Sequence, residues 1–312
     1  MPIDNFFDVI CIGDVAVDSV YRVGHLPGKD EKVDATFIGK FIGGTTCNTA
    51  RALSQLGRSV KFFTLIGNDE DGDFIQNQLK KSEIDLQVIQ SEGVTTPATQ
   101  ILISDDGEKA ILLFFSILDP KKIEVGFKSA VLPKTTVFFT TGFLPGFQQM
   151  ITDQTPIVIS LEKPTLQKST KPYEWAIKHA HTLVLDRHSF QFIFNKKINV
   201  TSLENVLSNQ SLSISYLIIT MGEQGVIGYS VDQKQTIHFN AHKIQPVDTT
   251  GAGDIFNAAF IHAYYFLDFS FKDSLRFSNA ISAAACEEPG TLLSKKAIQR
   301  GIKLFQEKGG AI

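Results

Sequence analysis

The stretch VDTTGAGDIFNAAF (247–260) decides how the rest of this sequence is interpreted. Gly251, Ala252 and Gly253 stand directly before an apolar helical run, so backbone N–H groups can converge at a helix N-terminus. That end carries partial positive charge and favours an anion. Asp254 would repel a phosphate there, but it has a use as a base that takes a proton from a hydroxyl during phosphoryl transfer. The alternative is a helix cap, since Asp is a favoured cap residue.

Two other kinds of nucleotide site fit this stretch poorly. In GAGDIF the third glycine of a dinucleotide fingerprint is replaced by Phe256, and the PVDTT before it is a poor strand. The pattern GxxxxGK[ST] occurs nowhere in the chain, which argues against a P-loop kinase.

The rest of the chain alternates apolar strands with amphipathic helices. An apolar run at 8–13 precedes a helical pattern within 43–57, and a second run at 59–67 precedes another at 71–82. This order predicts an α/β protein with a mostly parallel sheet covered by helices. Further strands are expected at 136–142, 156–162, 182–186 and 215–222, a hairpin at 226–230 and 235–239, and helices at 253–267, 272–286 and 294–307.

Two stretches, 17–41 and 98–114, alternate apolar and polar residues instead. The DDG at 105–107 is a hairpin turn signal. Such antiparallel pieces predict a small second sheet inserted at two points, a discontinuous lid over approximately 14–42 and 93–118. The whole chain, 1–312, is expected to form one domain.

Composition excludes several classes of protein. Of 312 residues, 43% are apolar and 20% charged, which is ordinary for a globular protein and argues against disorder. The net charge of −3 gives no global basic field for nucleic acid or an anionic membrane. Apolar runs such as 111–118 are far shorter than the ~20 residues of a membrane span. The N-terminus has no basic region typical of a secretory signal, and the three distant cysteines predict no disulfide, so we expect a cytoplasmic protein.

Two further segments carry candidate binding residues. In IGGTTCNTARALSQLG (42–57), Gly43 and Gly44 allow close backbone approach to a ligand, and the Asn48 amide can donate to and accept from a hydroxyl. The alternative is a glycine-rich loop that caps a helix. Asp18 in GDVAVD follows the first strand, near where ligands bind in open α/β sheets, and could accept bonds from two sugar hydroxyls; otherwise it is a surface charge.

Together these segments resemble the PfkB family of carbohydrate kinases. The resemblance runs from the first strand, through GG-x-x-x-N at 43–48 and LIGND at 65–69, to DTTGAGD at 248–254. It implies a ribokinase-like three-layer αβα sandwich with a small lid sheet. It also implies a kinase that uses ATP and Mg²⁺.

The resemblance implies roles for individual residues. Asp254 would be the general base, and the N–H groups of Gly251, Ala252 and Gly253 would form the anion hole over the γ-phosphate. The acceptor would be bound by Asp18, Gly43, Gly44 and Asn48. The nucleotide would be bound by Thr220, Gly222 and Asn279. A monovalent cation, K⁺, would be bound by Asp248 and Thr250.

The sequence departs from the family at three places. The Asn-x-x-Glu motif that positions metal and phosphates is here Asp186-Arg187-His188-Ser189, so Asp186 keeps an oxygen but Ser189 lacks the carboxylate. Asp186 is therefore expected to act on Mg²⁺ through water. Thr45 and Ala16 stand where ribokinases carry Lys and Asn, which weakens a ribose assignment.

We therefore expect a kinase that transfers the γ-phosphate of ATP to a sugar hydroxyl. A nucleoside kinase of the same family is the enzyme alternative, and a catalytically weak binding or regulatory protein is the alternative of another class. Exposed apolar residues on the lid strands would require a partner surface, which predicts a homodimer through the lid. The residues concerned include Phe37, Ile38, Ile101 and Leu113.

Overall fold

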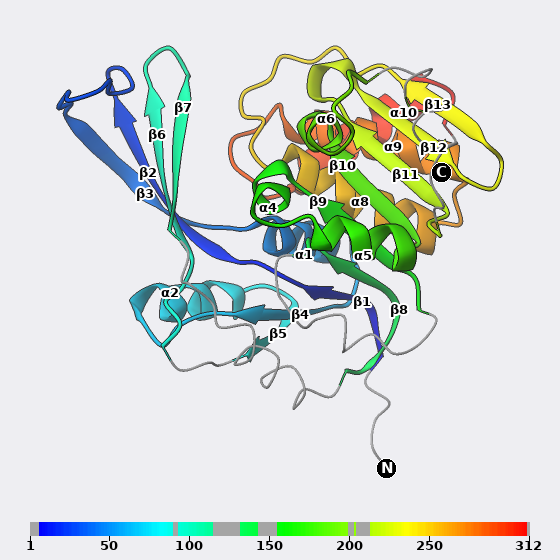
Figure 1. Cartoon of the computed structure of the whole chain (residues 1–312), viewed down its shortest axis with the longest axis horizontal. Coiled ribbons are helices and arrows are strands. Elements are labelled where there is room, and N and C mark those ends of the chain that lie inside the picture. Colours follow the sequence, from blue (N-terminus) through cyan, green and yellow to red (C-terminus); the bar gives the residue numbers. More distant parts are fainter. Residues whose placement is uncertain are drawn as a thin grey trace.

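The computed structural model describes residues 6–89, 93–114, 132–142, 155–198, 203 and 213–310. Two sheets organise this part of the chain (Figure 1). The larger one carries the helices, and the smaller one stands away from it at one side.

The larger sheet has nine strands in the order β13-β12-β11-β10-β9-β8-β1-β4-β5. Neighbours from β11 to β5 are parallel, and β12 is antiparallel to both β11 and β13. The predicted parallel sheet and its terminal hairpin are thus confirmed. The strands are β1 (Phe6–Ile12), β4 (Val60–Leu65), β5 (Ile84–Ile89), β8 (Lys134–Thr140), β9 (Ile157–Leu161), β10 (Thr182–Asp186), β11 (Tyr216–Thr220), β12 (Val226–Ser230) and β13 (Gln235–Phe239).

Helices cover both faces of this sheet. Successive residues of a buried strand point to opposite sides, so each face carries apolar side chains that must be covered. In β1, Val9 and Cys11 join one hydrophobic core, and Ile10 and Ile12 join the other. The first core is closed by α1 (Thr45–Gln55), α2 (Glu70–Leu79), α8 (Ala252–Phe266), α9 (Phe271–Ala285) and α10 (Lys295–Glu307). The second is closed by α4 (Lys163–Lys168), α5 (Lys171–His179) and α6 (Arg187–Phe194). The three-layer αβα arrangement is the expected one.

The smaller sheet has the order β3-β2-β6-β7, with β2 (Ala16–Val23), β3 (Ala35–Gly43), β6 (Ala98–Ser104) and β7 (Lys109–Phe114). Its outer pairs are antiparallel hairpins, as predicted, but the central pair β2–β6 is parallel, which the sequence interpretation did not include. The reason lies in connectivity. Strand β2 follows β1 and β6 follows β5, so both leave the same edge of the parallel sheet in the same direction.

The core also contains all three cysteines. Cys11, Cys47 and Cys286 are free and buried, as expected of small apolar core residues. None of the helices in the described ranges is both long and apolar enough to cross a membrane.

Candidate active site

Polar side chains gather where the parallel strands end. Asp14 follows β1, Glu162 follows β9, and Asp186 and Thr220 end β10 and β11. The carboxyl ends of parallel strands share one edge of a sheet, and ligands of open α/β sheets bind there. The first turns of α1 and α8 meet at the same place, since Asn48 and Asp254 are in contact across 206 positions of sequence.

Asp254 is held in a buried pair. Asn48 Nδ2 donates to Asp254 Oδ2 at 2.8 Å, and Thr49 Oγ1 donates to the Asp254 carbonyl oxygen at 3.3 Å. Only 8% of Asp254 is exposed. Burial raises the pKa of Asp254 well above its usual value, and the negative charge of Glu162 raises it further. The hydrogen bond from Asn48 lowers this pKa but does not offset the rise. A carboxylate of raised pKa is a stronger base for a hydroxyl proton.

The N-terminus of α8 has the conformation that its glycines allow. Gly251 has φ 76°, and a Cβ there would lie 3.0 Å from Thr291 Cγ2. A Cβ on Gly253 would meet nothing within 4 Å, so this side of the turn is open. The first N–H groups of a helix have no partner within it. The N–H of Ala252 donates to Thr249 O at 3.3 Å, which leaves it the least available of the three predicted for the anion hole.

Asp18 lies on β2 and is oriented by the neighbouring strand β6. Thr99 Oγ1 donates to Asp18 Oδ1 at 2.6 Å, and burial raises the pKa of Asp18. The opposite oxygen faces Gly43, where a Cβ would lie 2.0 Å from Asp18 Oδ2. Gly44 has φ 97°, and a Cβ there would be 2.7 Å from Val15 Cα. The two glycines are therefore required by the packing around Asp18 and the start of α1.

The substitution Gly43→Ala is expected to displace the Asp18 carboxylate. If Asp18 binds the acceptor, losing a hydrogen bond to a charged group costs about 1.5–3 kcal/mol, or roughly 10–100-fold in the acceptor KM. Gly24→Ala is the matched control, because a Cβ there meets nothing within 4 Å. Steady-state kinetics of both variants test this, and equal KM values would remove Asp18 from the acceptor site.

Two carboxylates that the sequence interpretation missed lie beside α1. Asp14 accepts from the backbone N–H groups of Thr45 and Thr46 at 2.8 and 3.1 Å and from Thr46 Oγ1 at 2.7 Å. It therefore caps α1 in place of Gly44, which has no side chain. An acidic residue directly after the first strand was the available signal.

Glu162 is the second missed carboxylate. Thr45 Oγ1 donates to Glu162 Oε1 at 3.1 Å. The residue as a whole is exposed, at the end of β9, but its carboxyl group loses part of its hydration among the neighbouring acids. Loss of hydration, together with the charges of Asp14 and Asp186, raises the pKa of Glu162 to about 7. The sequence gave no sign of this, because only the fold brings these acids together.

Asp186 has a structural task as well as the expected one. Its Oδ1 accepts from the Ser189 backbone N–H at 2.6 Å and caps α6. The side chain of Ser189 is completely buried. A carboxylate at position 189 would therefore be buried too.

A pocket of about 890 Å³ runs from the end of β11 to the start of α8. Thr220, Gly222 and Asn279 line it together with Ala252 and Gly253. The structure thus brings the predicted nucleotide residues to two of the three residues predicted for the anion hole, and Gly251 is not among the lining residues. Asp186 is not among its lining residues. Asn279 Nδ2 donates to Asn240 O at 2.9 Å, which fixes the loop after β13.

Comparison with known proteins agrees with the fold and with the family that the motifs resemble. The model of the pfkB family of carbohydrate kinases matches residues 7–298. A ribokinase of Staphylococcus aureus (strain COL) is 24% identical over 324 residues, which cover 96% of this chain and 97% of that protein. A nucleoside kinase of Methanocaldococcus jannaschii is 24% identical and covers 82% of this chain and 83% of its own. The crystal structure of a ribokinase from Thermotoga maritima has a TM-score of 0.77 at 19% identity, covering 95% of this chain and 99% of that one.

The fold and the site edge thus define a ribokinase-like α/β phosphotransferase. The chain belongs to the pfkB family of carbohydrate kinases.

Proposed function

We propose that this protein transfers the γ-phosphate of ATP to a hydroxyl group of a sugar. The observation that carries the proposal is Asp254, a buried carboxylate of raised pKa at the N-terminus of α8, directly beside the pocket of about 890 Å³. A helix cap alone needs no such burial and no partner such as Asn48.

In the proposed reaction Asp254 takes the proton of the acceptor hydroxyl. The hydroxyl oxygen forms a bond to the γ-phosphorus, the bond from that phosphorus to the β,γ-bridging oxygen breaks, and ADP leaves. The N–H groups of Gly251, Ala252 and Gly253 would hold the oxygens of the transferring group. Asp18, Gly43, Gly44 and Asn48 would bind the acceptor, and Thr220, Gly222 and Asn279 would bind the nucleotide.

The donor set fits Mg²⁺ held mainly by the nucleotide and water. Asp186 and Glu162 supply carboxylate oxygens, which are the ligands Mg²⁺ prefers. No group of three or more His, Cys, Asp or Glu able to hold a metal occurs among the described residues. When bound, Mg²⁺ would neutralise the β- and γ-phosphates. Glu162 is then the carboxylate that compensates for the one missing at Ser189.

The main alternative is phosphorylation of a nucleoside. Ala16 and Thr45 stand where ribokinases carry Asn and Lys, so the amide and the ammonium of those residues are absent. A nucleoside kinase of Methanocaldococcus jannaschii also matches 82% of this chain. ATP consumption measured against a panel of sugars and nucleosides tests both proposals. Thermal shift with an ATP analogue identifies the acceptor, since a ligand of the native state raises its apparent stability. A protein that binds an acceptor but never consumes ATP would contradict both proposals and favour a binding or regulatory role.

The pH dependence of the reaction follows from the carboxylates. Asp254 must be ionised to act, so kcat/KM is expected to fall as pH drops through its pKa. The charge of Glu162 raises that pKa, so Glu162→Gln should move the acid side of the profile to lower pH. Profiles of kcat/KM between about pH 5 and 9 measure this. A shift to higher pH would show that the two carboxylates are not coupled as described.

We further propose that the four-stranded sheet is a lid and pairs with a second copy of itself. Its exposed apolar side chains are 48–55% accessible. Because successive strand residues point to opposite faces, both faces of the sheet carry exposed apolar groups that a second copy could cover. Light scattering is expected to give about twice the chain mass of 34.5 kDa, and Leu112→Asp to give the single mass. A strict monomer of the unaltered protein at high concentration would contradict pairing. The residues concerned are Phe37, Ile38, Phe41, Ile111, Leu112, Leu113 and Phe114.

A further inference from the structure

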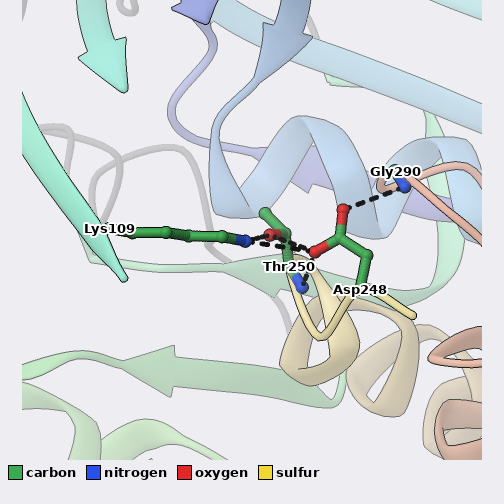
Figure 2. Close-up of polar contacts among 4 residues, drawn as sticks. All are labelled: Lys109, Asp248, Thr250 and Gly290. Atoms are coloured by element: carbon green, nitrogen blue, oxygen red, sulfur yellow. Dashed lines mark hydrogen bonds and ion pairs between the residues drawn. The ribbon is translucent and has the colours of Figure 1, made fainter. Parts of the chain in front are cut away.

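An ion pair joins the four-stranded sheet to the loop that precedes α8. Lys109 Nζ lies 3.2 Å from Asp248 Oδ1 and donates to Thr250 Oγ1 at 2.8 Å (Figure 2). Lys109 begins the edge strand β7, and 139 positions of sequence separate it from Asp248. The contact therefore links the smaller sheet to the loop before α8, two segments that are far apart in the sequence and meet only in the folded protein.

Asp248 holds this junction together. Its Oδ1 also accepts from the Thr250 N–H at 2.9 Å and from Thr250 Oγ1 at 2.7 Å, while Oδ2 accepts from the Gly290 N–H at 3.1 Å. Burial works against ionisation here, but these bonds and the Lys109 ammonium lower the pKa of Asp248 to about 2. The carboxylate is therefore ionised at every working pH and fixes the loop 248–250 to the loop at Gly290.

This junction is one residue away from the turn that the proposed function depends on. Thr250 immediately precedes Gly251, where an added Cβ would meet Thr291 in the loop after α9. The N–H groups of Gly251 itself and of the next two residues, Ala252 and Gly253, are those proposed to hold the transferring phosphate. A displacement of Thr250 would thus move the groups that must lie within hydrogen-bond reach of the phosphate, and small misplacements of such groups reduce rate strongly.

A potassium ion does not fit beside this lysine. The resemblance to the family implied a monovalent cation at Asp248 and Thr250. However, Asp248 Oδ1 and Thr250 Oγ1 both contact the Lys109 ammonium. A potassium ion on the same two oxygens would stand next to another positive charge, which is unfavourable. A lysine ammonium is itself a compact single charge with three donors.

We propose that the Lys109 ammonium is a built-in cation that positions the phosphate-binding turn and ties it to the lid sheet. Lys109 is in this sense a positioning residue, not one that touches the reacting atoms. The inference rests on the proposed kinase reaction for its effect on rate, but its structural part stands on the contacts of Asp248 alone. It predicts that the unaltered protein needs no added potassium.

A second ion pair of the same sheet supplies the matched control. Lys40, on the other edge strand β3, donates to Asp71 Oδ1 of α2 at 2.9 Å. Its side chain is 43% exposed, against 36% for Lys109. Lys40→Ala therefore removes an equivalent pair between this sheet and the body, but one that does not involve the loop 248–250.

The kinetic test compares the unaltered protein, Lys109→Ala and Lys40→Ala in KCl, NH₄Cl and NaCl at equal ionic strength. Lys109→Ala is expected to lose roughly 10–100-fold in kcat, with a smaller change in the acceptor KM. K⁺ or NH₄⁺, but not Na⁺, should then restore its kcat by at least about 5-fold. The unaltered protein and Lys40→Ala should not respond to the choice of cation. Potassium dependence of the unaltered protein, or no specific rescue of Lys109→Ala, would overturn the proposal.

Hydrogen exchange separates this proposal from the kinase proposal. Amides at 248–253 are expected to exchange faster in Lys109→Ala than in Lys40→Ala, and K⁺ should slow them again. This measurement needs no turnover. If it succeeds while no variant consumes ATP, the positioning role stands and the kinase proposal fails; if exchange is equal in both variants, the positioning role is wrong. Lys109→Arg, which keeps the charge, should retain slow exchange.

Discussion

Asp254→Asn is expected to lower kcat by ~10²–10⁴-fold while nucleotide binding and the fold persist. The amide oxygen of the new side chain can still accept the bond from Asn48, but the amide cannot take a proton from a hydroxyl. Single-turnover assays with ATP and the best acceptor from the panel measure the loss.

The direction of the change in stability of the same variant can also be predicted. A carboxyl group whose pKa is higher in the folded than in the unfolded state favours folding at low pH, and that contribution is lost as pH rises through the folded pKa. Burial raises the pKa of Asp254, so its ionised form opposes folding near neutral pH and above. We expect the Tm of Asp254→Asn at about pH 8 to be no lower than that of the unaltered protein.

Asp273→Asn is the control for Asp254→Asn. Asp273 is the third residue of α9, as Asp254 is the third residue of α8, so the chemical change and the helix position are the same. Its side chain accepts from Ser270 Oγ at 2.7 Å and pairs with Arg276, and it is not among the residues that line the pocket of about 890 Å³. Activity of Asp254→Asn as high as that of Asp273→Asn would reduce Asp254 to a helix-terminal residue.

The second large effect is expected at Asp186. Asp186→Asn should raise the Mg²⁺ concentration for half-maximal rate by roughly 10–100-fold, as for other residues that hold a metal through an intermediate ligand. Asn caps a helix about as well as Asp, so this substitution keeps the bond from the Ser189 N–H and removes only the charge. Titration of the rate with Mg²⁺ at fixed ATP measures the effect.

Two further variants make this test specific. Asp186→Ala also removes the cap of α6, which costs about 0.5–2 kcal/mol of stability, so its lower Tm separates capping from metal binding. Glu162→Gln should raise the Mg²⁺ requirement too if Glu162 compensates for the carboxylate missing at Ser189. An unchanged requirement in both Asp186→Asn and Glu162→Gln would remove these residues from the metal site.

The order of elements and the main motif could be predicted from the sequence. Apolar runs such as 8–13 and 59–67 are buried on both faces of a parallel sheet, so their composition alone identifies them. The start of α8 is equally local, because its glycines and Asp254 are consecutive. The alternation in 17–41 and 98–114 predicted a second sheet. It did not predict the parallel pairing of β2 with β6, which depends on where β1 and β5 lie.

The site residues outside those motifs required the tertiary structure. Glu162 belongs to no motif, and its pKa of about 7 arises from its environment at the sheet edge and the charges of Asp14 and Asp186. The sequence showed that Ser189 lacks the family's carboxylate, but only the structure shows that its side chain is buried.

The sequence by itself thus determined the α/β class, the family and the segment that contains the proposed base, because each can be recognised from short motifs and patterns of residues that are neighbours along the chain. Only the tertiary structure decided that Asn48 holds Asp254 and that Lys109 binds Asp248. These pairs are 206 and 139 positions apart. Their formation depends on strand order and on how two sheets are oriented, and side-chain contacts at such separations leave no periodic or local signal in a single sequence.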